Sequence, residues 1–264
     1  METEGKVIVI KIGGSTLGST DTTMEDLVAL QNKKISMVVV HGGAQLVTEW
    51  LGRLGISTSF IGGLRVTDKQ SLEVVTAVLA GLVNKELVAA IEVLGGKAIG
   101  MCGIDGGLTE AEIKRPELGL AGEVINVNVN LLRILLEAGY IPIIAPISLG
   151  AANEIGKGIK SVNVNADNVA SEIAVALKAQ KLIFLTDVNG VHDSSGKVIS
   201  HLTAKTIKQL NSSGATSGGM VVKVEACLRA LTKVPVVRII DGRVPHILLR
   251  EMEGKETGTT ITKG

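Results

Sequence analysis

Aromatic side chains are scarce in this sequence. They make up 2% of the 264 residues, whereas apolar residues make up 45%. A core with so few rings must be built from Val, Ile, Leu and Ala, which is typical of a parallel sheet covered by helices on both faces. The net charge is only +1. The sequence therefore lacks the basic surface expected of a protein that binds nucleic acid or an anionic membrane.

Cysteine and uninterrupted apolar runs are also rare. Cys102 and Cys227 are too few for a disulfide framework and do not have the spacing of metal ligands. No apolar run reaches the ~18 residues of a membrane span without a charge. Residues 1–6 lack the cationic region of a secretory signal. We therefore expect a cytoplasmic protein that acts on small-molecule substrates.

Apolar runs and helical patterns alternate along the chain. Residues 6–12 and 36–40 are apolar runs that predict buried strands, and helical patterns follow at residues 21–32 and 44–54. Such alternation is typical of βαβ units. We therefore expect an α/β fold, a three-layer αβα sandwich with a mainly parallel central sheet and two lobes.

The rest of the chain continues this alternation. Residues 71–91 predict one long apolar helix, the glycine-rich residues 98–107 predict short strands and hairpins, and residues 187–197 predict a hairpin. A second βαβ round is expected to begin at residue 123. The other predicted strands are 123–127, 141–145, 182–186, 234–240 and 259–262. The other predicted helices are 131–138, 166–178, 204–211 and 217–231. No low-complexity linker is visible. We therefore expect two lobes, residues 1–150 and 151–264, that share one sheet.

Three short segments pair a glycine turn with a charge or an imidazole: residues 11–14 (KIGG), 41–43 (HGG) and 219–223 (GMVVK). The first two follow apolar runs, so they should lie at the carboxyl ends of strands, where open α/β sheets bind ligands. Flexible backbone and a point charge suit a migrating phosphoryl group. The N–H groups expected to contact its oxygens belong to Gly13, Gly14, Gly42 and Gly43.

Lys11, Lys223 and Asp167 are the predicted catalytic residues. A carboxylate that attacks a phosphoryl group brings two anions together, so cations on both sides lower the barrier. The alternative for each lysine is an exposed surface position, but both lie within apolar and glycine-rich runs. We expect Asp167 to hold both ammonium groups in place. It could also cap a helix.

Arg65, Asn163 and Asn165 are the predicted contacts of the amino-acid substrate. The guanidinium of Arg65 matches the two oxygens of a carboxylate, although a surface ion pair would also explain it. Asn163 and Asn165 alternate with Val162 and Val164. Both amides should therefore point to one face of a strand, and that face is not simple core.

Six segments in order resemble the amino-acid kinase family: residues 11–14, 41–43, 63–68, 163–167, 186–190 and 219–223. Residues 63–106 are most similar to the branch of the family that phosphorylates N-acetyl-L-glutamate. The resemblance implies transfer of the γ-phosphoryl of ATP to the side-chain carboxylate of that substrate, an early step of arginine biosynthesis. It implies a substrate-binding and dimer-forming N-terminal lobe and an ATP-binding C-terminal lobe, and it assigns Gly42 and Gly43 to substrate as well as phosphate.

The resemblance also implies a nucleotide site. The expected ATP contacts are Thr186, Asp187, Val188, Gly190, Val191, Ser217, Gly218 and Gly219. Mg²⁺ should accompany ATP and be held mainly by phosphate oxygens and water. No residue of the chain is predicted as a metal ligand.

Other functions remain open from the sequence. A related kinase could act on a carrier-bound aminoadipate in lysine biosynthesis, and carbamate or nucleoside monophosphate kinases share the glycine pairs. A non-catalytic amino-acid sensor could use the same fold for binding only. Arg65 in its segment favours the free amino-acid derivative, and the joint presence of Lys11, Asp167 and Lys223 disfavours the sensor.

The apolar helix at residues 71–91 predicts an assembly. Only Glu73, Lys85 and Glu86 are charged in it, so more than its sheet-facing side must be covered. We expect a homodimer in which Gly81 lets two helices cross closely. Residues 246–251 partly resemble the arginine site of regulated relatives, but few residues precede Lys11, so we expect weak arginine inhibition or none.

Overall fold

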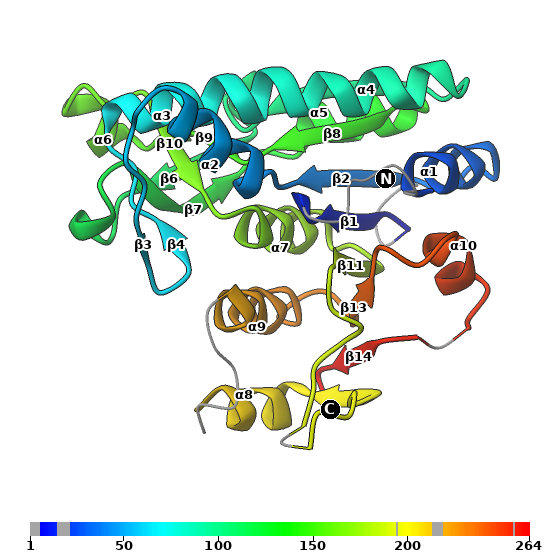
Figure 1. Cartoon of the computed structure of the whole chain (residues 1–264). Coiled ribbons are helices and arrows are strands. Elements are labelled where there is room, and N and C mark those ends of the chain that lie inside the picture. Colours follow the sequence, from blue (N-terminus) through cyan, green and yellow to red (C-terminus); the bar gives the residue numbers. More distant parts are fainter. Residues whose placement is uncertain (1–5, 15–21, 194, 213–218, 256) are drawn as a thin grey trace.

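The computed structural model describes residues 6–14, 22–193, 195–212, 219–255 and 257–264, and its centre is an eight-stranded sheet (Figure 1). The strand order is β12-β14-β13-β11-β1-β2-β8-β5, and all neighbouring pairs are parallel except β13 and β14. These strands are β1 (Ile8–Ile12), β2 (Met37–His41), β5 (Ala98–Cys102), β8 (Ile141–Ala145), β11 (Lys181–Thr186), β12 (His201–Thr203), β13 (Val236–Asp241) and β14 (Thr259–Thr262). The predicted mainly parallel sheet is confirmed.

Successive residues of the central strands point into two different cores. In β1, Val9 belongs to one core, whereas Ile8 and Ile10 belong to the other. In β11, Phe184 and Ile183 are divided in the same way. Consecutive side chains leave a strand on opposite faces, so both faces of this sheet are buried. That double burial explains why its strands are nearly continuous runs of Val, Ile and Leu.

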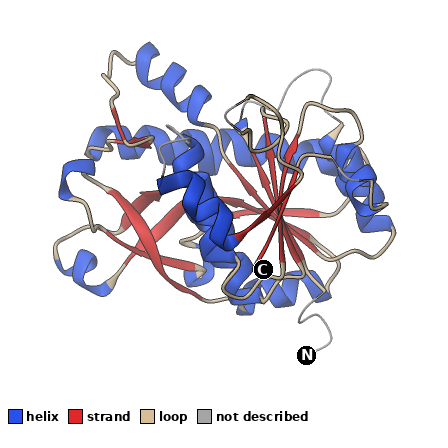
Figure 2. Cartoon of the chain, turned by 90° about the horizontal axis from the view of Figure 1, so that it is seen from below, coloured by secondary structure: helices blue, strands red, loops and turns tan. Residues whose placement is uncertain are grey.

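Helices close both cores, which gives the predicted three layers (Figure 2). The core that contains Val9 is covered by α5 (Asn130–Glu137), α7 (Ala166–Leu177), α8 (Ala204–Ser212) and α9 (Gly219–Ala230). The opposite core is covered by α1 (Thr23–Asn32), α2 (Ala44–Arg53), the long helical segment Lys69–Val93 and α10 (Ile247–Met252).

The segment Lys69–Val93 is one long helix with a wide turn in its middle. It consists of α3 (Lys69–Thr76), the π-helix η2 (Ala77–Val83) and α4 (Asn84–Val93). By length and composition alone it could cross a bilayer, although 39% of its most apolar window is buried. Its α4 part packs on β5 and β8, as the core helix of a globular protein does, so this is weak evidence for a membrane span.

Four short strands form a closed barrel beside the main sheet: β6 (Thr109–Glu112), β7 (Ala121–Val127), β9 (Ile147–Gly150) and β10 (Ser161–Val164). Two sequence predictions are corrected here. β7 belongs to this barrel and does not begin a second βαβ round, because it is exposed along much of its length and could not lie between two helical layers. Residues 98–102 form no hairpin, because they are the parallel edge strand β5.

Short elements complete the chain. The hairpin β3 (Phe60–Ile61) and β4 (Leu64–Arg65) projects beside α2, and His192 bridges Val198 within the turn-rich region after β11. The remaining pieces are α6 (Ala152–Gly156) and the 3₁₀ turns Asp105–Gly107 and Pro116–Leu118. The division at residue 150 stays a prediction. It falls at the end of β9, and the barrel joins strands from both sides of it, because β10 pairs with β7 and β9.

Candidate active site

Lys11, Asp167 and Lys223 meet although they lie far apart in the sequence. Lys11 is on β1, Asp167 is in the first turn of α7, and Lys223 is on α9. The Nζ atom of Lys11 lies 2.9 Å from Oδ1 of Asp167, and the Nζ atom of Lys223 donates to Oδ2 at 2.8 Å. The three side chains are 12%, 8% and 9% exposed. One buried carboxylate therefore holds two ammonium groups, as predicted.

The charges of this cluster do not cancel. Burial alone would raise the pKa of Asp167, yet Lys11 and Lys223 hold that pKa well below its usual range. Burial lowers the pKa of Lys11, although Asp167 opposes this shift. The carboxylate stays ionised and is no general base near neutral pH. With both lysines protonated, two positive charges and one negative charge leave an excess of one, which favours an anion beside the cluster.

Two glycine turns lie back to back next to the lysines. A Cβ atom on Gly14 would lie 2.8 Å from the Cα atom of Gly43, a distance that a side chain cannot accept. Gly43 has a φ of 151°, and a Cβ there would lie 2.7 Å from a methyl carbon of Leu79. A side chain on Gly14 would separate the two loops, and Gly43 has a positive φ that favours glycine beside the packed side chain of Leu79.

The backbone donors of these turns divide into two pairs. The N–H of Gly13 donates to the carbonyl of Leu185 at 3.0 Å, and that of Gly42 donates to the carbonyl of Ile12 at 2.9 Å. The prediction that all four glycine N–H groups point at phosphate is therefore wrong for Gly13 and Gly42, because their amides complete strand pairing. In the part of the chain that the structure describes, no hydrogen bond engages the N–H of Gly14 or Gly43.

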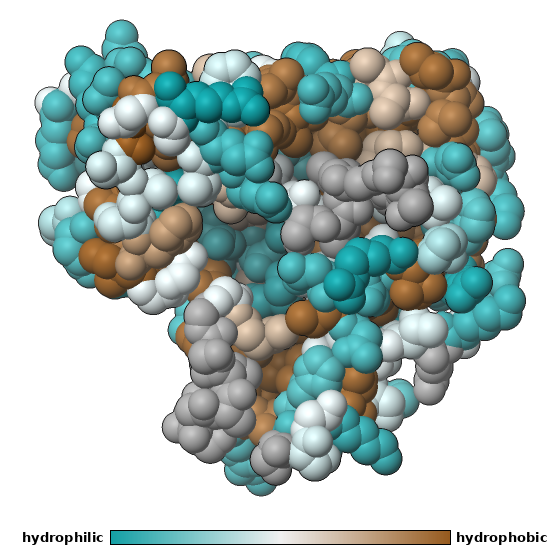
Figure 3. Space-filling view, in the orientation of Figure 1, coloured by the Kyte–Doolittle hydropathy of each residue, from teal (hydrophilic) through white to brown (hydrophobic). Residues whose placement is uncertain are grey.

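Two cavities meet at the lysine cluster. The hairpin cavity, about 200 Å³, lies between the β3–β4 hairpin, the π-helix and β10, and the α9 cavity, about 390 Å³, lies between β11 and α9. Lys11, Gly14, Ala44 and Asp167 line both cavities. Figure 3 shows a hydrophilic hollow near the middle of the view, to the right of the hairpin. Two ligands, one in each cavity, would therefore touch beside Lys11.

Arg65 lies in the wall of the hairpin cavity without an acidic partner. Its Nη2 donates to the carbonyl of Ala44 at 2.9 Å and to Oγ1 of Thr48 at 2.8 Å, and its Nη1 donates to Thr58. The guanidinium also stacks 4.7 Å from the ring centre of Phe60. No carboxylate among the described residues pairs with it, although its residue is only 8% exposed. Burial lowers the pKa of Arg65, yet a guanidinium remains charged, and a buried cation with only neutral partners favours a ligand carboxylate.

The two predicted asparagines have different surroundings. Nδ2 of Asn163 donates to Oγ1 of Thr67 at 3.1 Å, and its side chain lines the hairpin cavity. Asn165 also lines that cavity, but its Oδ1 accepts from the N–H of Asp167 at 2.8 Å and caps α7. Asp167 is therefore not the helix cap considered from the sequence, because Asn165 has that role.

The predicted nucleotide contacts lie only partly together. Thr186, Asp187, Val188 and Gly219 line the α9 cavity. Gly190 and Val191 do not line it. The N–H of Val191 donates to Oγ1 of Thr259 at 2.8 Å, and a Cβ on Gly190 would collide with the same hydroxyl. Ser217 and Gly218 lie outside the described residues.

Sequence reasoning missed several residues of the hairpin cavity. Val75 and Leu79 line it from the long helix, and Lys114 and Arg115 line it from the loop after β6. The apolar pair could not be told from ordinary core by its pattern. Adjacent basic residues at 114–115 were the only available signal, and surface positions explain such pairs equally well.

Comparisons with known proteins agree with this geometry. A sequence profile of the amino acid kinase family matches residues 6–241. The chain belongs to the amino acid kinase family. It is 42% identical over 261 residues to an acetylglutamate kinase of Dehalococcoides mccartyi, an alignment that covers 99% of this chain and 96% of the relative.

Solved structures of other proteins have the same fold as this chain. The structure of smu.665 from Streptococcus mutans UA159 aligns with a TM-score of 0.83 and 27% identity and covers 98% of this chain and 99% of that chain. N-acetylglutamate synthase from Neisseria gonorrhoeae, complexed with coenzyme A and N-acetyl-glutamate, aligns with a TM-score of 0.85 and 25% identity. That alignment covers 100% of this chain and 61% of the synthase chain.

Proposed function

We propose that this chain transfers the γ-phosphoryl group of ATP to the side-chain carboxylate of N-acetyl-L-glutamate in arginine biosynthesis, giving ADP and an acyl phosphate. The observation that carries the proposal is the pair of cavities that meet at Lys11 and Asp167, with Arg65 in one wall and Lys223 beside the other. The name of the relative at 42% identity supports the choice of substrate.

The geometry supplies what this reaction needs. A carboxylate oxygen of the substrate attacks the γ-phosphorus, the bond from that phosphorus to the bridging oxygen breaks, and the leaving oxygen stays with ADP. Negative charge gathers on the migrating group and on the leaving oxygen. Lys11, which borders both cavities, contributes positive charge next to the migrating group. Lys223 contributes positive charge next to the leaving oxygen. Asp167 fixes both ammonium groups before substrates arrive, so little reorganisation is needed.

Recognition of the amino-acid substrate is assigned to the hairpin cavity. Arg65 binds the α-carboxylate with its guanidinium, and Asn163 binds the amide portion. Asn165 contributes mainly through its cap of α7. Val75 and Leu79 supply an apolar wall that suits an acetyl group. The cavity of about 200 Å³ leaves room for a small metabolite.

ATP is assigned to the α9 cavity. Lys223, the Gly219 end of α9 and Thr186 fit a polyphosphate, because a helix N-terminus and an ammonium group both favour anions. Mg²⁺ would neutralise phosphate charge when bound. Within the described ranges no three acidic, histidine or cysteine residues gather to hold a metal, so we assign its coordination mainly to phosphate oxygens and water.

The assembly that we propose is a cytoplasmic homodimer with small-molecule substrates and no nucleic-acid or membrane partner. The outer side of the Lys69–Val93 helix supports it. Leu82 and Val93 are exposed there, and a Cβ on Gly81 would meet nothing within 4 Å. Light scattering tests this assembly, because a monomer or a hexamer would contradict it.

A hydroxylamine assay tests the activity. The purified chain with ATP and Mg²⁺ should give a hydroxamate with N-acetyl-L-glutamate and much less with glutamate, aminoadipate, carbamate or UMP. A faster reaction with another acceptor would mean that this family member phosphorylates that acceptor instead of N-acetyl-L-glutamate. No ADP release with any acceptor, while N-acetyl-L-glutamate still binds, would support the amino-acid sensor instead.

A further inference from the structure

His41 is a wholly buried histidine directly before the Gly42–Gly43 turn. It ends β2 and is 0% exposed. Its Nδ1 lies 2.9 Å from the carbonyl oxygen of Gly42. A carbonyl oxygen can only accept, so Nδ1 must carry the proton and donate it. His41 therefore fixes the direction of the carbonyl in the peptide that joins Gly42 to Gly43.

Asn84 determines this tautomer from the other side of the ring. Its Nδ2 lies 2.8 Å from the carbonyl oxygen of Ile143 and 3.3 Å from that of Met101, and 3.2 Å from Nε2 of His41. Two carbonyl oxygens can only accept, so they fix the amide with its nitrogen toward them. That nitrogen has only two N–H groups for these three neighbours, so one N–H is shared, and the nitrogen cannot accept a hydrogen bond. Nε2 must therefore be an acceptor without a proton. The side chain of Asn84 is 0% exposed.

The π-helix brings Asn84 to this position. In an α-helix, residues five apart are rotated by about 140°, because each residue turns about 100°. In the wider turn, closed by i→i+5 hydrogen bonds, each residue turns less, so residues five apart point in more similar directions than in an α-helix. Leu79 and Asn84 are five apart across η2, and both face the glycine turn. Leu79 contacts the position that a Gly43 side chain would take, and Asn84 contacts His41.

We propose that His41 and Asn84 are positioning residues that aim the N–H of Gly43 at the phosphoryl group in transfer. The peptide between Gly42 and Gly43 is trans, so its N–H points opposite to its carbonyl. Because the carbonyl is held by His41, the N–H faces away from the imidazole. Gly43 lines the hairpin cavity beside Lys11. This inference rests on the proposed kinase function.

The imidazole of His41 can keep its hydrogen bond to the Gly42 carbonyl because it stays neutral with its one proton on Nδ1. Burial, with a further contribution from Lys11, lowers the pKa of His41 to about 4. A second proton would have to enter on Nε2, where Asn84 already presents an N–H. Loss of the Asn84 donor should therefore change both the tautomer of His41 and the direction of the Gly43 amide.

Asn84→Asp tests the proposal with almost no change of shape. It keeps the side-chain volume but removes both amide protons. We expect kcat to fall about 10–10²-fold, as for a small misplacement of a catalytic group, with KM values for both substrates within about threefold. In spectra of ¹⁵N-labelled histidine, the His41 signal should change from the neutral Nδ1–H form to a form protonated on Nε2. An unchanged kcat or an unchanged His41 signal would overturn the proposal.

Gln31→Glu is the matched control. The amide of Gln31 also bridges backbone groups, donating to the carbonyls of Lys97 and Gly139 at 2.8 Å and accepting from the N–H of Lys97. It has no contact with His41. We expect this variant to lose stability but to keep kcat and the His41 signal. An equal loss of kcat in both variants would mean that any broken amide bridge lowers activity, and would reject the specific role.

A measurement on the unaltered chain avoids any folding defect. Addition of ADP, Mg²⁺, aluminium fluoride and N-acetyl-L-glutamate should shift the Gly43 amide resonance strongly and leave the Gly42 amide, bonded to Ile12, nearly unchanged. Equal shifts of both amides, or none at Gly43 when the ligands bind, would overturn the inference. An inactive chain in the hydroxylamine assay would instead reject the kinase function, because the tautomer of His41 is read without turnover.

Discussion

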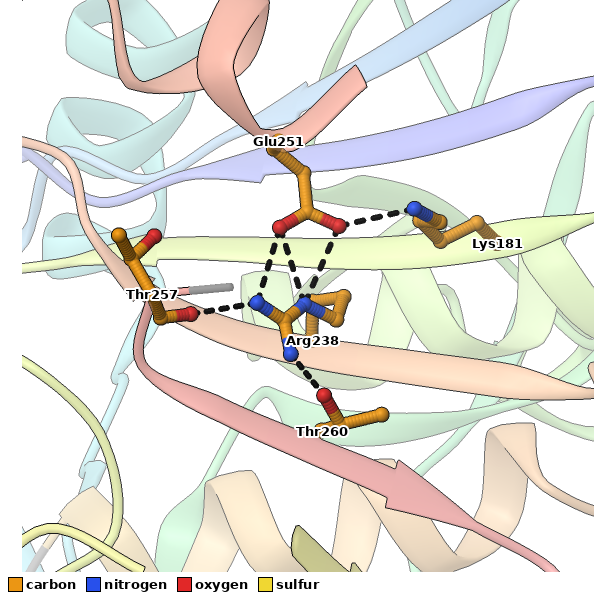
Figure 4. Close-up of polar contacts among 5 residues, drawn as sticks. All are labelled: Lys181, Arg238, Glu251, Thr257 and Thr260. Carbon is orange, nitrogen blue, oxygen red and sulfur yellow. Dashed lines mark hydrogen bonds and ion pairs between the residues drawn. The ribbon is translucent and has the colours of Figure 1, made fainter. Parts of the chain in front are cut away.

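Two clusters of this protein each place one buried carboxylate between two cations, yet only the first of them lines the two cavities described above. In the first, Asp167 holds Lys11 and Lys223. In the second, Glu251 on α10 holds Arg238 on β13 and Lys181 on β11 (Figure 4). Both clusters have the same formal charges, so formal charge alone does not make a site.

The difference lies in how many donors are already used. Nε and Nη2 of Arg238 bond to Glu251, Nη1 donates to Thr260, and Nη2 also donates to the carbonyl of Thr257. The guanidinium of this second cluster is closed by protein partners, and the cluster ties α10 to the sheet. The lysines of the first cluster bond to Asp167, Lys223 also lies over the ring of Phe184, and both border a cavity. Donors left for a ligand, and not burial or charge, distinguish the candidate active site.

Breaking the closed cluster should cost more free energy than any other change considered below. Glu251→Ala should lower the free energy of unfolding by ~3–5 kcal/mol, because it leaves Arg238 buried without an anion. Denaturant unfolding measures this change. The double variant Arg238→Met with Glu251→Met should lose less, because no unpaired charge stays buried. A double variant no more stable than Glu251→Ala would contradict this account.

Lys223→Ala should affect catalysis much more than stability. We expect kcat to fall by at least ~10²-fold with little change in KM, because this cation acts mainly in the transition state. Steady-state kinetics and thermal unfolding measure the two effects. Arg229→Ala is the control on the same helix, because Arg229 pairs with Glu172 at the surface and should leave kcat unchanged. Near-normal turnover of Lys223→Ala would remove Lys223 from the mechanism.

Arg65→Lys should weaken substrate binding by a smaller amount. An ammonium group cannot form the two-pronged contact of a guanidinium, so affinity for N-acetyl-L-glutamate should fall by ~1–3 kcal/mol while ATP binding stays the same. Calorimetry with each ligand measures both values. Arg53→Lys, which alters an arginine stacked on Trp50, should change neither. Equal losses for both ligands in Arg65→Lys would indicate a folding defect.

The smallest expected effect is that of free arginine. Glu251 lies in the segment whose sequence partly resembles an arginine site, but Arg238 and Lys181 already bond to its carboxylate. We therefore expect weak inhibition or none at millimolar arginine in the hydroxylamine assay. Strong inhibition by sub-millimolar arginine would show that the closed cluster opens or that arginine binds elsewhere.

Much of the fold and of the site could be predicted from local pattern. The apolar runs of β1 and β2 and the glycine pairs after them placed Lys11 and the turns correctly, because doubly buried parallel strands have a distinct composition. The barrel strand β7 was misplaced because a short half-exposed strand can pair with several partners. The use of the Gly13 and Gly42 N–H groups depends on strand register, which no motif specifies.

Periodicity and ordered motifs were enough to predict the family, the sheet and the residue types that a phosphoryl transfer needs. The charges that remain available to a ligand depend on tertiary packing. Asp167 and Glu251 are both acidic residues of helices, and their difference arises from partners more than ten residues away in the chain. The same holds for Asn84, whose amide reaches His41 only across a π-helix. Contacts of this kind depend on how distant segments pack, so residue spacing cannot specify them.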